Sequence, residues 1–314
     1  MPPISPLVVS VPEEAYAAGL GTLDGVEVLT WDLTQPHPRQ DELRLVVPPY
    51  QTSLRVGDRL RGLERLQVVQ LLTAGYEQLL ADVPEGVTLC NAAGVHDAST
   101  AELAVALTLA SMRRIPEFHA AQADSSWASP RIWPALADRR VLLVGYGQIG
   151  RAIARRLAPF EVSITAVATR ARAGDDLVDR VAAIDELPDL ASSHDVLILI
   201  VPLTGRTRRL VDASLLARMP DGGIVVNVAR GPVVDTDALR AECASGRLRA
   251  ALDVTDPEPL PPGHPLWTTP GVLITPHVGG ATTAMRPRAL RLLRNQLEAL
   301  RDGHDLVNVV GRGL

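Results

Sequence analysis

The stretch VLLVGYGQIG, residues 141–150, decides the fold of this chain. An apolar, strand-like run leads directly into a glycine-rich turn, and a helical pattern follows. Gly145 permits the tight turn, Gly147 lets backbone amides approach a pyrophosphate, and Gly150 allows a helix to pack closely against the strand. In this context the pattern predicts a bound dinucleotide rather than a purely structural turn. The predicted cofactor contacts of the turn are Gly145, Gly147, Gln148, Ile149 and Gly150.

The next predicted strand, residues 162–167, indicates which dinucleotide is bound. An acidic residue is expected about 20 positions after the glycine turn, where it would hold the ribose hydroxyls of NAD(H). Here the strand is followed by ATRAR, residues 168–172, which contains no carboxylate. Thr169, Arg170 and Arg172 instead suit a 2′-phosphate, so we predict NADP(H) as the preferred cofactor and NAD(H) as the alternative. A second interpretation takes both arginines as solvated loop charges.

Short apolar runs on both sides of this stretch predict two series of buried strands. Near-continuous apolar runs are typical of parallel strands covered on both faces, and their alternation with helical patterns predicts a doubly wound α/β fold. The length of 314 residues predicts two domains. The first series is Leu7–Val11, Val26–Trp31, Leu43–Val47, Leu66–Leu72 and Val87–Cys90, and the second is Val141–Val144, Val162–Val167, Asp195–Val201, Gly223–Val228, Arg249–Val254 and Val272–Thr275.

Four further segments complete the predicted organisation. A Ser-Thr cap precedes an alanine-rich helical run that spans Ser99–Ile115. The segment Pro116–Asp138, which contains two tryptophans, is expected to be a connecting loop or an interface arm. A final helix is predicted over Met285–Arg301, followed by an apolar run, Leu306–Val310, that needs a sheet to join.

The composition excludes several kinds of site. The chain contains no lysine, so all 31 basic residues are arginines, and Schiff-base catalysis and a Walker-type phosphate lysine are excluded. A net charge of −5 argues against a nucleic-acid partner, and no apolar run is long enough for a membrane span. Cys90 and Cys243 lie outside any metal-ligand spacing, so we expect no metal site and a reducing, cytoplasmic compartment.

Three segments place polar residues beside Gly or Pro just after an apolar strand, where open α/β sheets bind ligands. They are NVARGPVVD (residues 227–235), ALDVTDPEP (251–259) and TPHVGGAT (275–282), and together they supply a guanidinium, carboxylates and an imidazole. On residue type alone, Arg230 could equally cap a helix or pair with Asp235.

With these three segments in this order after the glycine turn, the chain resembles the D-isomer-specific 2-hydroxyacid dehydrogenase family over nearly its whole length. The stretches LLTAGYE, NAAGVHDASTAELAVALTL and VPLTGRTRRLV are similar to further recurring parts of that family. The resemblance implies two Rossmann-like domains with the active site in the cleft between them. The dinucleotide-binding domain, residues 98–283, would be inserted into a substrate-binding domain of residues 1–97 and 284–314, which would give the terminal strand its sheet.

The resemblance also implies roles for individual residues. Arg230 would bind the substrate carboxylate and polarise the keto oxygen, His277 would act as general acid in reduction and base in oxidation, and Glu258 would pair with His277. The chemistry agrees, because a guanidinium stabilises developing alkoxide charge and a carboxylate favours the protonated imidazole. Asp256, two residues away, is a competing carboxylate. Further implied cofactor contacts are Pro202, Thr207, Val228, Asp253, His277 and Gly279, and implied substrate contacts are the backbone amides of Ala74 and Gly75, with Tyr50 and Arg286 as weaker candidates.

The function that these expectations favour is an NADPH-dependent reductase of small 2-oxo acids, such as glyoxylate or hydroxypyruvate, forming D-2-hydroxy acids. The alternatives are a D-3-phosphoglycerate dehydrogenase and a non-catalytic, NAD(P)-sensing protein like the family's corepressors. Formate dehydrogenases have Gln where Glu258 stands, and phosphite oxidisers use a Lys near Ala74, which this lysine-free chain lacks. The resemblance also implies a homodimer, with the alanine-rich helix after Thr100 at the interface.

Overall fold

The computed structural model describes residues 6–50, 56–77, 79–127 and 132–313. The chain forms two compact units, the first from residues 1–96 and 283–314 and the second from residues 97–282. The second unit therefore interrupts the first along the sequence. Each unit is built on a mostly parallel sheet with helices, as the predicted α/β class requires.

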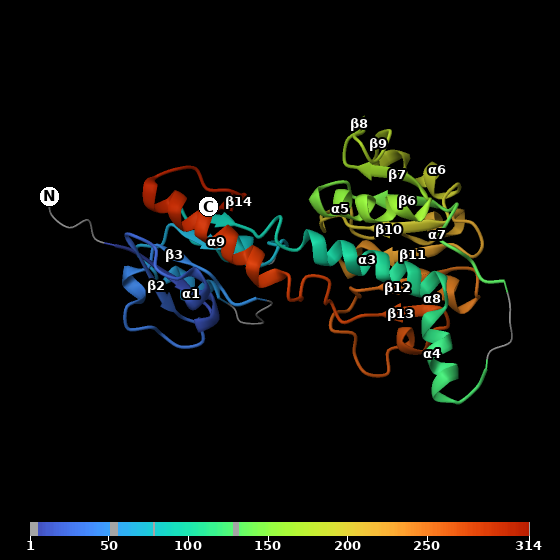
Figure 1. The fold of residues 1–314 in the computed structure, drawn as a ribbon, viewed down its shortest axis with the longest axis horizontal. Helices are drawn as coiled ribbons and strands as arrows, with labels where there is room; N and C mark the ends of the chain where they lie inside the picture. The colour runs from blue at the N-terminus through green and yellow to red at the C-terminus, as the bar shows by residue number, and fades with distance from the viewer. Residues whose placement is uncertain (1–5, 51–55, 78, 128–131, 314) are drawn as a thin grey trace. The chain divides into compact units, whose positions relative to one another are not determined.

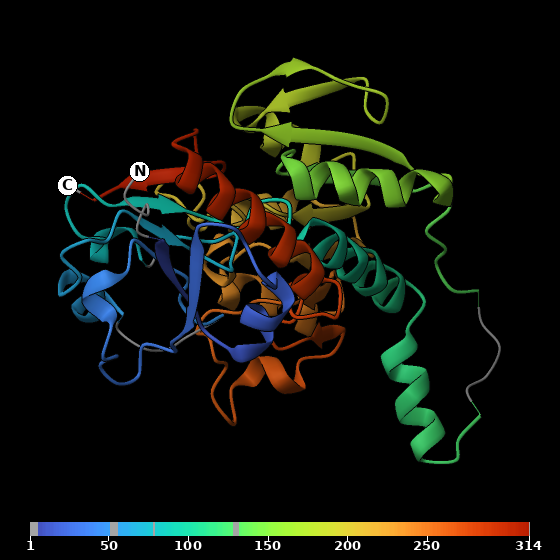
Figure 2. The ribbon, with the colours of Figure 1, turned by 60° about the vertical axis from the view of Figure 1, so that its left-hand side comes forward.

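The sheet of the first unit has the strand order β14-β5-β4-β3-β1-β2. Its pairs are parallel except that β14 runs antiparallel to β5, so the C-terminal strand does join the first sheet (Figure 2). That strand begins three residues later than expected, because the backbone amide of Val307 is bound to the side chain of Gln296 instead of to a neighbouring strand. The strands are β1 (Leu7–Val11), β2 (Val26–Thr30), β3 (Leu45–Val46), β4 (Val68–Gln70), β5 (Thr88–Cys90) and β14 (Val309–Arg312).

Helices α1 (Glu14–Leu20) and α9 (Met285–Asp302) pack together on the first sheet, although they lie near opposite ends of the chain. Tyr16 and Leu20 of α1 join Leu293 and Leu297 of α9 in one apolar core. A separate core forms on the other face of the sheet, where the short helix α2 (Gly57–Arg61) contributes Leu60.

The sheet of the second unit has the order β13-β12-β11-β10-β6-β7-β9-β8 and is parallel apart from its last pair. Its strands are apolar without a break because both faces are covered: Val141 and Leu143 of β6 enter one core, and Leu142 and Val144 enter the other. The strands are β6 (Arg140–Val144), β7 (Ser163–Ala168), β8 (Arg172–Ala173), β9 (Arg180–Ala183), β10 (Val196–Leu199), β11 (Ile224–Asn227), β12 (Arg249–Leu252) and β13 (Val272–Ile274).

Helices cover both faces of this second sheet (Figure 1). The long helices α3 and α5 pack on one face, where their alanines allow close approach, and α6, α7 and α8 pack on the other. The glycine turn leads from β6 directly into α5. The helices are α3 (Asp97–Met112), α4 (Ile115–Ala123), α5 (Gln148–Leu157), α6 (Leu187–Ala191), α7 (Ala213–Arg218) and α8 (Thr236–Ala244).

The expectation of a loop from Pro116 is wrong for its first part, which forms α4. The proline lies in the first helical turn, where its missing amide hydrogen costs no hydrogen bond. Arg114, with φ +56°, separates α4 from α3. The short antiparallel pair β8–β9 at the sheet edge was likewise not expected, because strands this short carry no readable periodicity.

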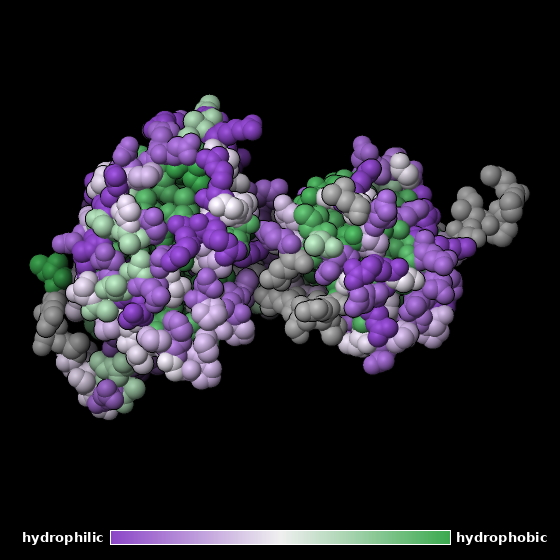
Figure 3. Space-filling view, turned by 180° about the vertical axis from the view of Figure 1, so that it is seen from behind, coloured by the Kyte–Doolittle hydropathy of each residue, from purple (hydrophilic) through white to green (hydrophobic). Residues whose placement is uncertain are grey.

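Hydrophilic side chains cover most of the face seen in Figure 3, with apolar patches between them. Within the described part of the chain, no helix combines the length and apolar character needed to cross a bilayer.

Candidate active site

The glycine turn has the geometry of a phosphate-binding loop. Gly145 has φ +109°, and a side chain there would place Cβ 2.4 Å from the carbonyl oxygen of Ile200. A Cβ on Gly150 would lie 2.1 Å from the carbonyl oxygen of Gly145, whereas Gly147 faces open space. Gly147 caps α5, so the first amides of the helix are open to an anion approaching over Gly147. The turn therefore fits a dinucleotide pyrophosphate.

A cavity of about 440 Å³ lies beside this turn, at the carboxyl ends of β6, β7 and β10. Its walls are mostly apolar, which suits an adenosine group. The buried hydroxyl of Thr207 donates to the carbonyl oxygen of Pro202 at 2.6 Å and accepts from the amide of Thr204 at 2.8 Å, so this loop is rigid. The cavity is lined by Val144, Val167, Ala168, Thr169, Ile184, Val201, Pro202, Thr204, Gly205, Arg206 and Thr207.

The two arginines predicted to bind a 2′-phosphate differ in their surroundings. Arg170 is exposed, directly follows the cavity residue Thr169, and makes no hydrogen bond or ion pair with any described residue. Arg172 lies on β8 and donates to the carbonyl oxygen of Tyr146 in the glycine turn at 2.6 Å. Its guanidinium therefore already donates one hydrogen bond within the protein.

The loop that carries Arg230 is shaped by Asn227 at the end of β11. The Asn227 side chain accepts from the amide of Ala229 at 3.0 Å and donates to the carbonyl oxygen of Arg230 at 3.0 Å. Val228, between them, is buried. A side chain on Gly231 would place Cβ 1.8 Å from the carbonyl oxygen of Thr255, so only glycine allows this approach.

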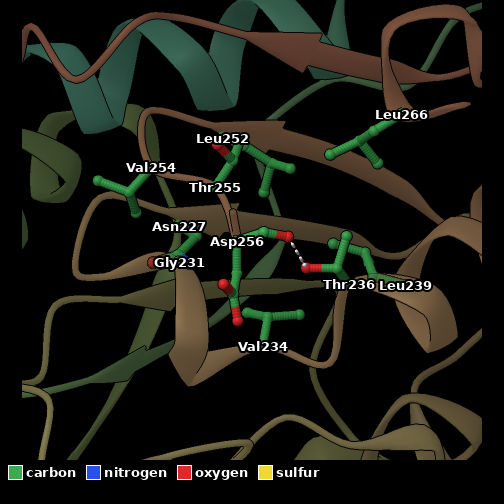
Figure 4. Close-up of a pocket in the computed structure, with 10 residues that line it drawn as sticks. All are labelled: Asn227, Gly231, Val234, Thr236, Leu239, Leu252, Val254, Thr255, Asp256 and Leu266. Atoms are coloured by element: carbon green, nitrogen blue, oxygen red, sulfur yellow. Dashed lines mark hydrogen bonds between the residues drawn. The ribbon is translucent and has the colours of Figure 1, made fainter. Parts of the chain in front are cut away.

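Figure 4 shows how closely the segment after Arg230 packs against the segment that leads to Glu258. Thr236 donates a hydrogen bond to the carbonyl oxygen of Asp256 at 3.0 Å, and the space left around them is about 10 Å³. This packing fixes the backbone from which Glu258 extends two residues later. The cavity is lined by Asn227, Gly231, Val234, Thr236, Leu239, Leu252, Val254, Thr255, Asp256 and Leu266.

The structure argues against the interpretation that Arg230 pairs with Asp235. Asp235 caps α8 by accepting from the amide of Ala238 at 3.1 Å, and it pairs with Arg209 at 2.5 Å. Arg230 instead donates to the carbonyl oxygen of Ala229 at 2.6 Å. Among the described residues, no carboxylate forms an ion pair with Arg230, so its charge is available to an anionic ligand.

His277 and Glu258 form a close pair, with 2.5 Å between Nδ1 and Oε1. Partial burial by itself would raise the pKa of Glu258, but the hydrogen bond and charge of His277, an amide hydrogen bond at Thr255 and the charge of Arg230 bring that pKa below its usual value. Glu258 is therefore a carboxylate at neutral pH. Asp256, the competing carboxylate, is exposed and makes no such contact.

His277 stands in the left-handed backbone region, with φ +53°, and Asp253 holds it there. The amide of His277 donates to the carbonyl oxygen of Asp253 at 2.8 Å. The buried Asp253 carboxylate accepts from the Thr275 hydroxyl at 2.6 Å and from the amides of Val278 and Gly279 at 2.9 Å each. Sequence reasoning gave Asp253 only a cofactor contact and missed its support of the His277 loop, which the Thr-Pro-His-Val-Gly pattern could have indicated.

The substrate-binding candidates in the first unit lie on one loop and its surroundings. The carbonyl oxygens of Ala74 and Gly75 accept from Asn91 and from Thr73, each at 2.7 Å. The amides of Ala74 and Gly75 donate to no group among the described residues, so they are available to a carboxylate. They remain the strongest candidates in this unit.

Two weaker candidates in the same unit have protein contacts of their own. Tyr50 stacks on His96 with ring centroids 5.7 Å apart. Arg286 lies 5.7 Å from the ring centroid of Tyr16 and 3.4 Å from Glu13.

Comparison with known proteins identifies the family. A family model described as "D-isomer specific 2-hydroxyacid dehydrogenase, NAD binding domain" matches residues 105–279. The glyoxylate reductase/hydroxypyruvate reductase of Mus musculus is 34% identical over 302 residues, which cover 92% of each chain.

Two solved structures resemble the whole chain. A D-isomer specific 2-hydroxyacid dehydrogenase from Xanthobacter autotrophicus, in complex with NADPH and MES, has a TM-score of 0.80 at 28% identity and covers 98% of both chains. An NADPH-dependent glyoxylate/hydroxypyruvate reductase from Sinorhizobium meliloti, in complex with NADP and sulfate, has a TM-score of 0.82 at 26% identity, again with 98% of both chains covered. Sequence, fold and site therefore agree that this chain belongs to the D-isomer specific 2-hydroxyacid dehydrogenase family.

Proposed function

We propose that this protein is an NADPH-dependent reductase of small 2-oxo acids, with glyoxylate and hydroxypyruvate as its substrates and NADH as a poorer cofactor. The observation that carries the proposal is the 2.5 Å pair of His277 and Glu258. The charge of Arg230, which forms an ion pair with no carboxylate in the described part of the chain, acts on the same Glu258 carboxylate. The names of the relatives from Mus musculus and Sinorhizobium meliloti support the substrate class.

Different residues of the second unit bind different parts of the cofactor. The amides after Gly147 bind the pyrophosphate, the cavity that includes Thr169 and Pro202 takes the adenosine, and Arg170 attracts the 2′-phosphate. When bound, NADPH supplies a hydride to the 2-oxo carbon. The Asp253 carboxylate accepts hydrogen bonds from the amides of Val278 and Gly279 and so keeps the His277 loop in place.

The catalytic residues transfer a proton to the substrate and stabilise the negative charge that develops on it. His277 binds Glu258 through Nδ1, and Nε2 is the ring nitrogen that would give a proton to the substrate oxygen. The carboxylate of Glu258 stabilises the protonated imidazole and fixes its orientation. Arg230 stabilises the negative charge that develops on the substrate oxygen and binds the substrate carboxylate. In the first unit, the amides of Ala74 and Gly75 donate to no described residue and suit a carboxylate ligand.

A panel of 2-oxo acids assayed with NADPH and with NADH tests the proposal. We expect turnover of glyoxylate and hydroxypyruvate with a lower KM for NADPH than for NADH, and little turnover of 3-phosphohydroxypyruvate. His277→Ala and Arg230→Ala should each lower kcat/KM by two or more orders of magnitude without unfolding the protein. Tight NADPH binding without turnover of any 2-oxo acid would favour a sensing protein instead.

We also propose that the protein is a cytoplasmic homodimer. The expected interface helix, α3, is largely buried in the core of its own unit, so we place the interface at α4 instead. No residue of α4 is buried within the chain, Ile115 is 54% exposed, and the helix extends beyond the end of α3 in both ribbon views (Figures 1 and 2), where Glu117 pairs with Arg249 of its own unit. Trp127 is also exposed, beyond the end of the helix. A second copy of the chain would cover these apolar groups. The free, buried Cys90 and Cys243 suit a reducing compartment. Light scattering after size exclusion tests the dimer, and a monomeric mass rejects it.

A further inference from the structure

We propose that Tyr146, Arg172 and Asp175 form a clasp that positions the glycine turn for the cofactor's pyrophosphate, and that Arg172 therefore acts as a positioning residue and not as a ligand of the 2′-phosphate. The inference rests on the proposed use of a dinucleotide, but it holds for NADPH and NADH alike.

The clasp joins the glycine turn to the edge of the sheet. Arg172 on β8 donates to the carbonyl oxygen of Tyr146 at 2.6 Å. In the opposite direction, the hydroxyl of Tyr146 donates to Asp175 Oδ1 at 2.9 Å. Tyr146 stands between the first two glycines of the turn, so both its backbone and its side chain are held by the β8–β9 hairpin.

Asp175 is the centre of the clasp. Its carboxylate also accepts from the amide of Leu177 at 2.9 Å, and Arg151 of α5 lies 2.9 Å from Oδ2. The amide hydrogen bond of Leu177, together with the hydroxyl hydrogen bond of Tyr146 and the charge of Arg151, outweighs the effect of burial and holds the pKa of Asp175 below its usual value. Because Tyr146 precedes Gly147 and Arg151 follows Gly150, the single carboxylate binds both flanks of the segment that faces the pyrophosphate.

The hydroxyl of Tyr146 stays a donor at all physiological pH values. Its side chain is 7% exposed, and burial together with the charge of Asp175 raises its pKa to about 12. The backbone of the hairpin packs closely at this point, because a Cβ on Gly174 would lie 1.9 Å from the carbonyl oxygen of Val178. A hydrogen bond from a buried phenol to a carboxylate is of the stronger, charge-assisted kind.

The neighbouring arginines have different partners. Arg206, on the cavity wall, pairs with Asp185 at 2.9 Å. Arg170 has no hydrogen bond or ion pair with a described residue, so its guanidinium is available to a 2′-phosphate. Loss of Arg170 should therefore change the choice between the cofactors, whereas loss of the clasp should weaken both.

Dissociation constants of NADPH and NADH, measured by calorimetry for Tyr146→Phe, Arg172→Ala and Arg170→Ala, test this assignment. We expect Tyr146→Phe and Arg172→Ala to raise both constants by the same factor, about tenfold for one charge-assisted hydrogen bond, and to leave their ratio unchanged. Arg170→Ala should raise the constant for NADPH alone. Arg180→Ala is the matched control, because Arg180 lies on the same hairpin but pairs with Glu186.

Hydrogen exchange of the protein without cofactor gives a second measurement, in which the amides of residues 172–181 should exchange faster in Tyr146→Phe. If Arg172→Ala weakens NADPH and spares NADH, or if Tyr146→Phe leaves both constants unchanged, the clasp is overturned. If the wild-type protein binds dinucleotides but reduces no 2-oxo acid, the proposed function is wrong. The dissociation constants of these variants then still support or overturn the clasp. Binding of neither dinucleotide overturns both.

Discussion

Replacement of Glu258 by glutamine changes one oxygen to an amide group and removes the charge beside His277. The wild-type pair is 2.5 Å apart, and both side chains are more than a third exposed, at 38% and 39%. A hydrogen bond to a charged group contributes about 1.5–3 kcal/mol, and this exposure favours the lower end because water screens the pair. A loss of about 1.5 kcal/mol corresponds to a roughly tenfold fall in kcat/KM for reduction.

The Glu258→Gln substitution also changes how the rate of reduction depends on pH. Reduction requires the protonated imidazole of His277, which the ionised Glu258 stabilises. Because the pKa of Glu258 is lowered, the advantage of the wild type over Glu258→Gln should be present at neutral pH and be lost as the pH falls through that lowered pKa. Steady-state rates with saturating NADPH, measured across the neutral and acidic range, give the size of this advantage and its dependence on pH.

Asp256→Asn is the matched control for this experiment. It removes a carboxylate two residues away that is exposed and does not contact His277. The wild-type rate and profile should persist in this variant. Equal profiles for Glu258→Gln and the wild type, with rates within a factor of two, would refute the role given to the pair.

Three further changes test the parts of the site that depend on packing. Gly150→Ala places Cβ 2.1 Å from the carbonyl oxygen of Gly145, so the NADPH dissociation constant should rise at least about tenfold by calorimetry, and an unchanged constant would contradict the geometry. Asp253→Ala leaves two amides and a hydroxyl without their acceptor, and we expect kcat/KM to fall about a hundredfold, with a near-wild-type rate as the contrary result. Asp235→Ala removes the cap of α8 and should lower the free energy of unfolding by about 1 kcal/mol in urea at neutral pH. Because the amide of Ala238, followed by Arg209, depresses the pKa of Asp235, this contribution is present above about pH 4 and is lost as the pH falls through the lowered pKa. A difference that persists in strong acid would contradict this account.

Several features of the fold could be predicted because they depend on local pattern. The strand β6 and the glycine turn lie where VLLVGYGQIG places them, since only glycine allows the approaches at Gly145 and Gly150. Apart from β8, β9 and the C-terminal β14, the other strands follow their apolar runs because both faces of each sheet are buried, although their ends are one or two residues shorter than most runs suggest. The segment after Pro116 could not be placed, because a proline in the first turn is compatible with either a loop or a helix.

The site, like the fold, could be predicted only in part. The residue types at Arg230, Glu258 and His277 were recognisable from three short segments, and so was the chemistry they suit. Residue types alone did not distinguish Glu258 from Asp256 as the partner of His277, and only the resemblance to the family indicated Glu258. The contact itself depends on a loop that Thr236 holds and on the close approach of Gly231 to Thr255. Nor did the sequence show that Asp253 accepts three hydrogen bonds from the His277 loop.

By itself, the sequence determined the α/β class, the glycine turn, the family and the kinds of group that the chemistry needs, because each of these is carried by residues close together in the chain. Only the tertiary structure decided which partners those groups have. Arg172, two residues from Arg170, is bound to the glycine turn 26 residues earlier, while Arg170 contacts no described residue. The physical reason is that a hydrogen bond depends on distance and direction in space, which packing of the β8–β9 hairpin against the turn sets and which no local pattern records.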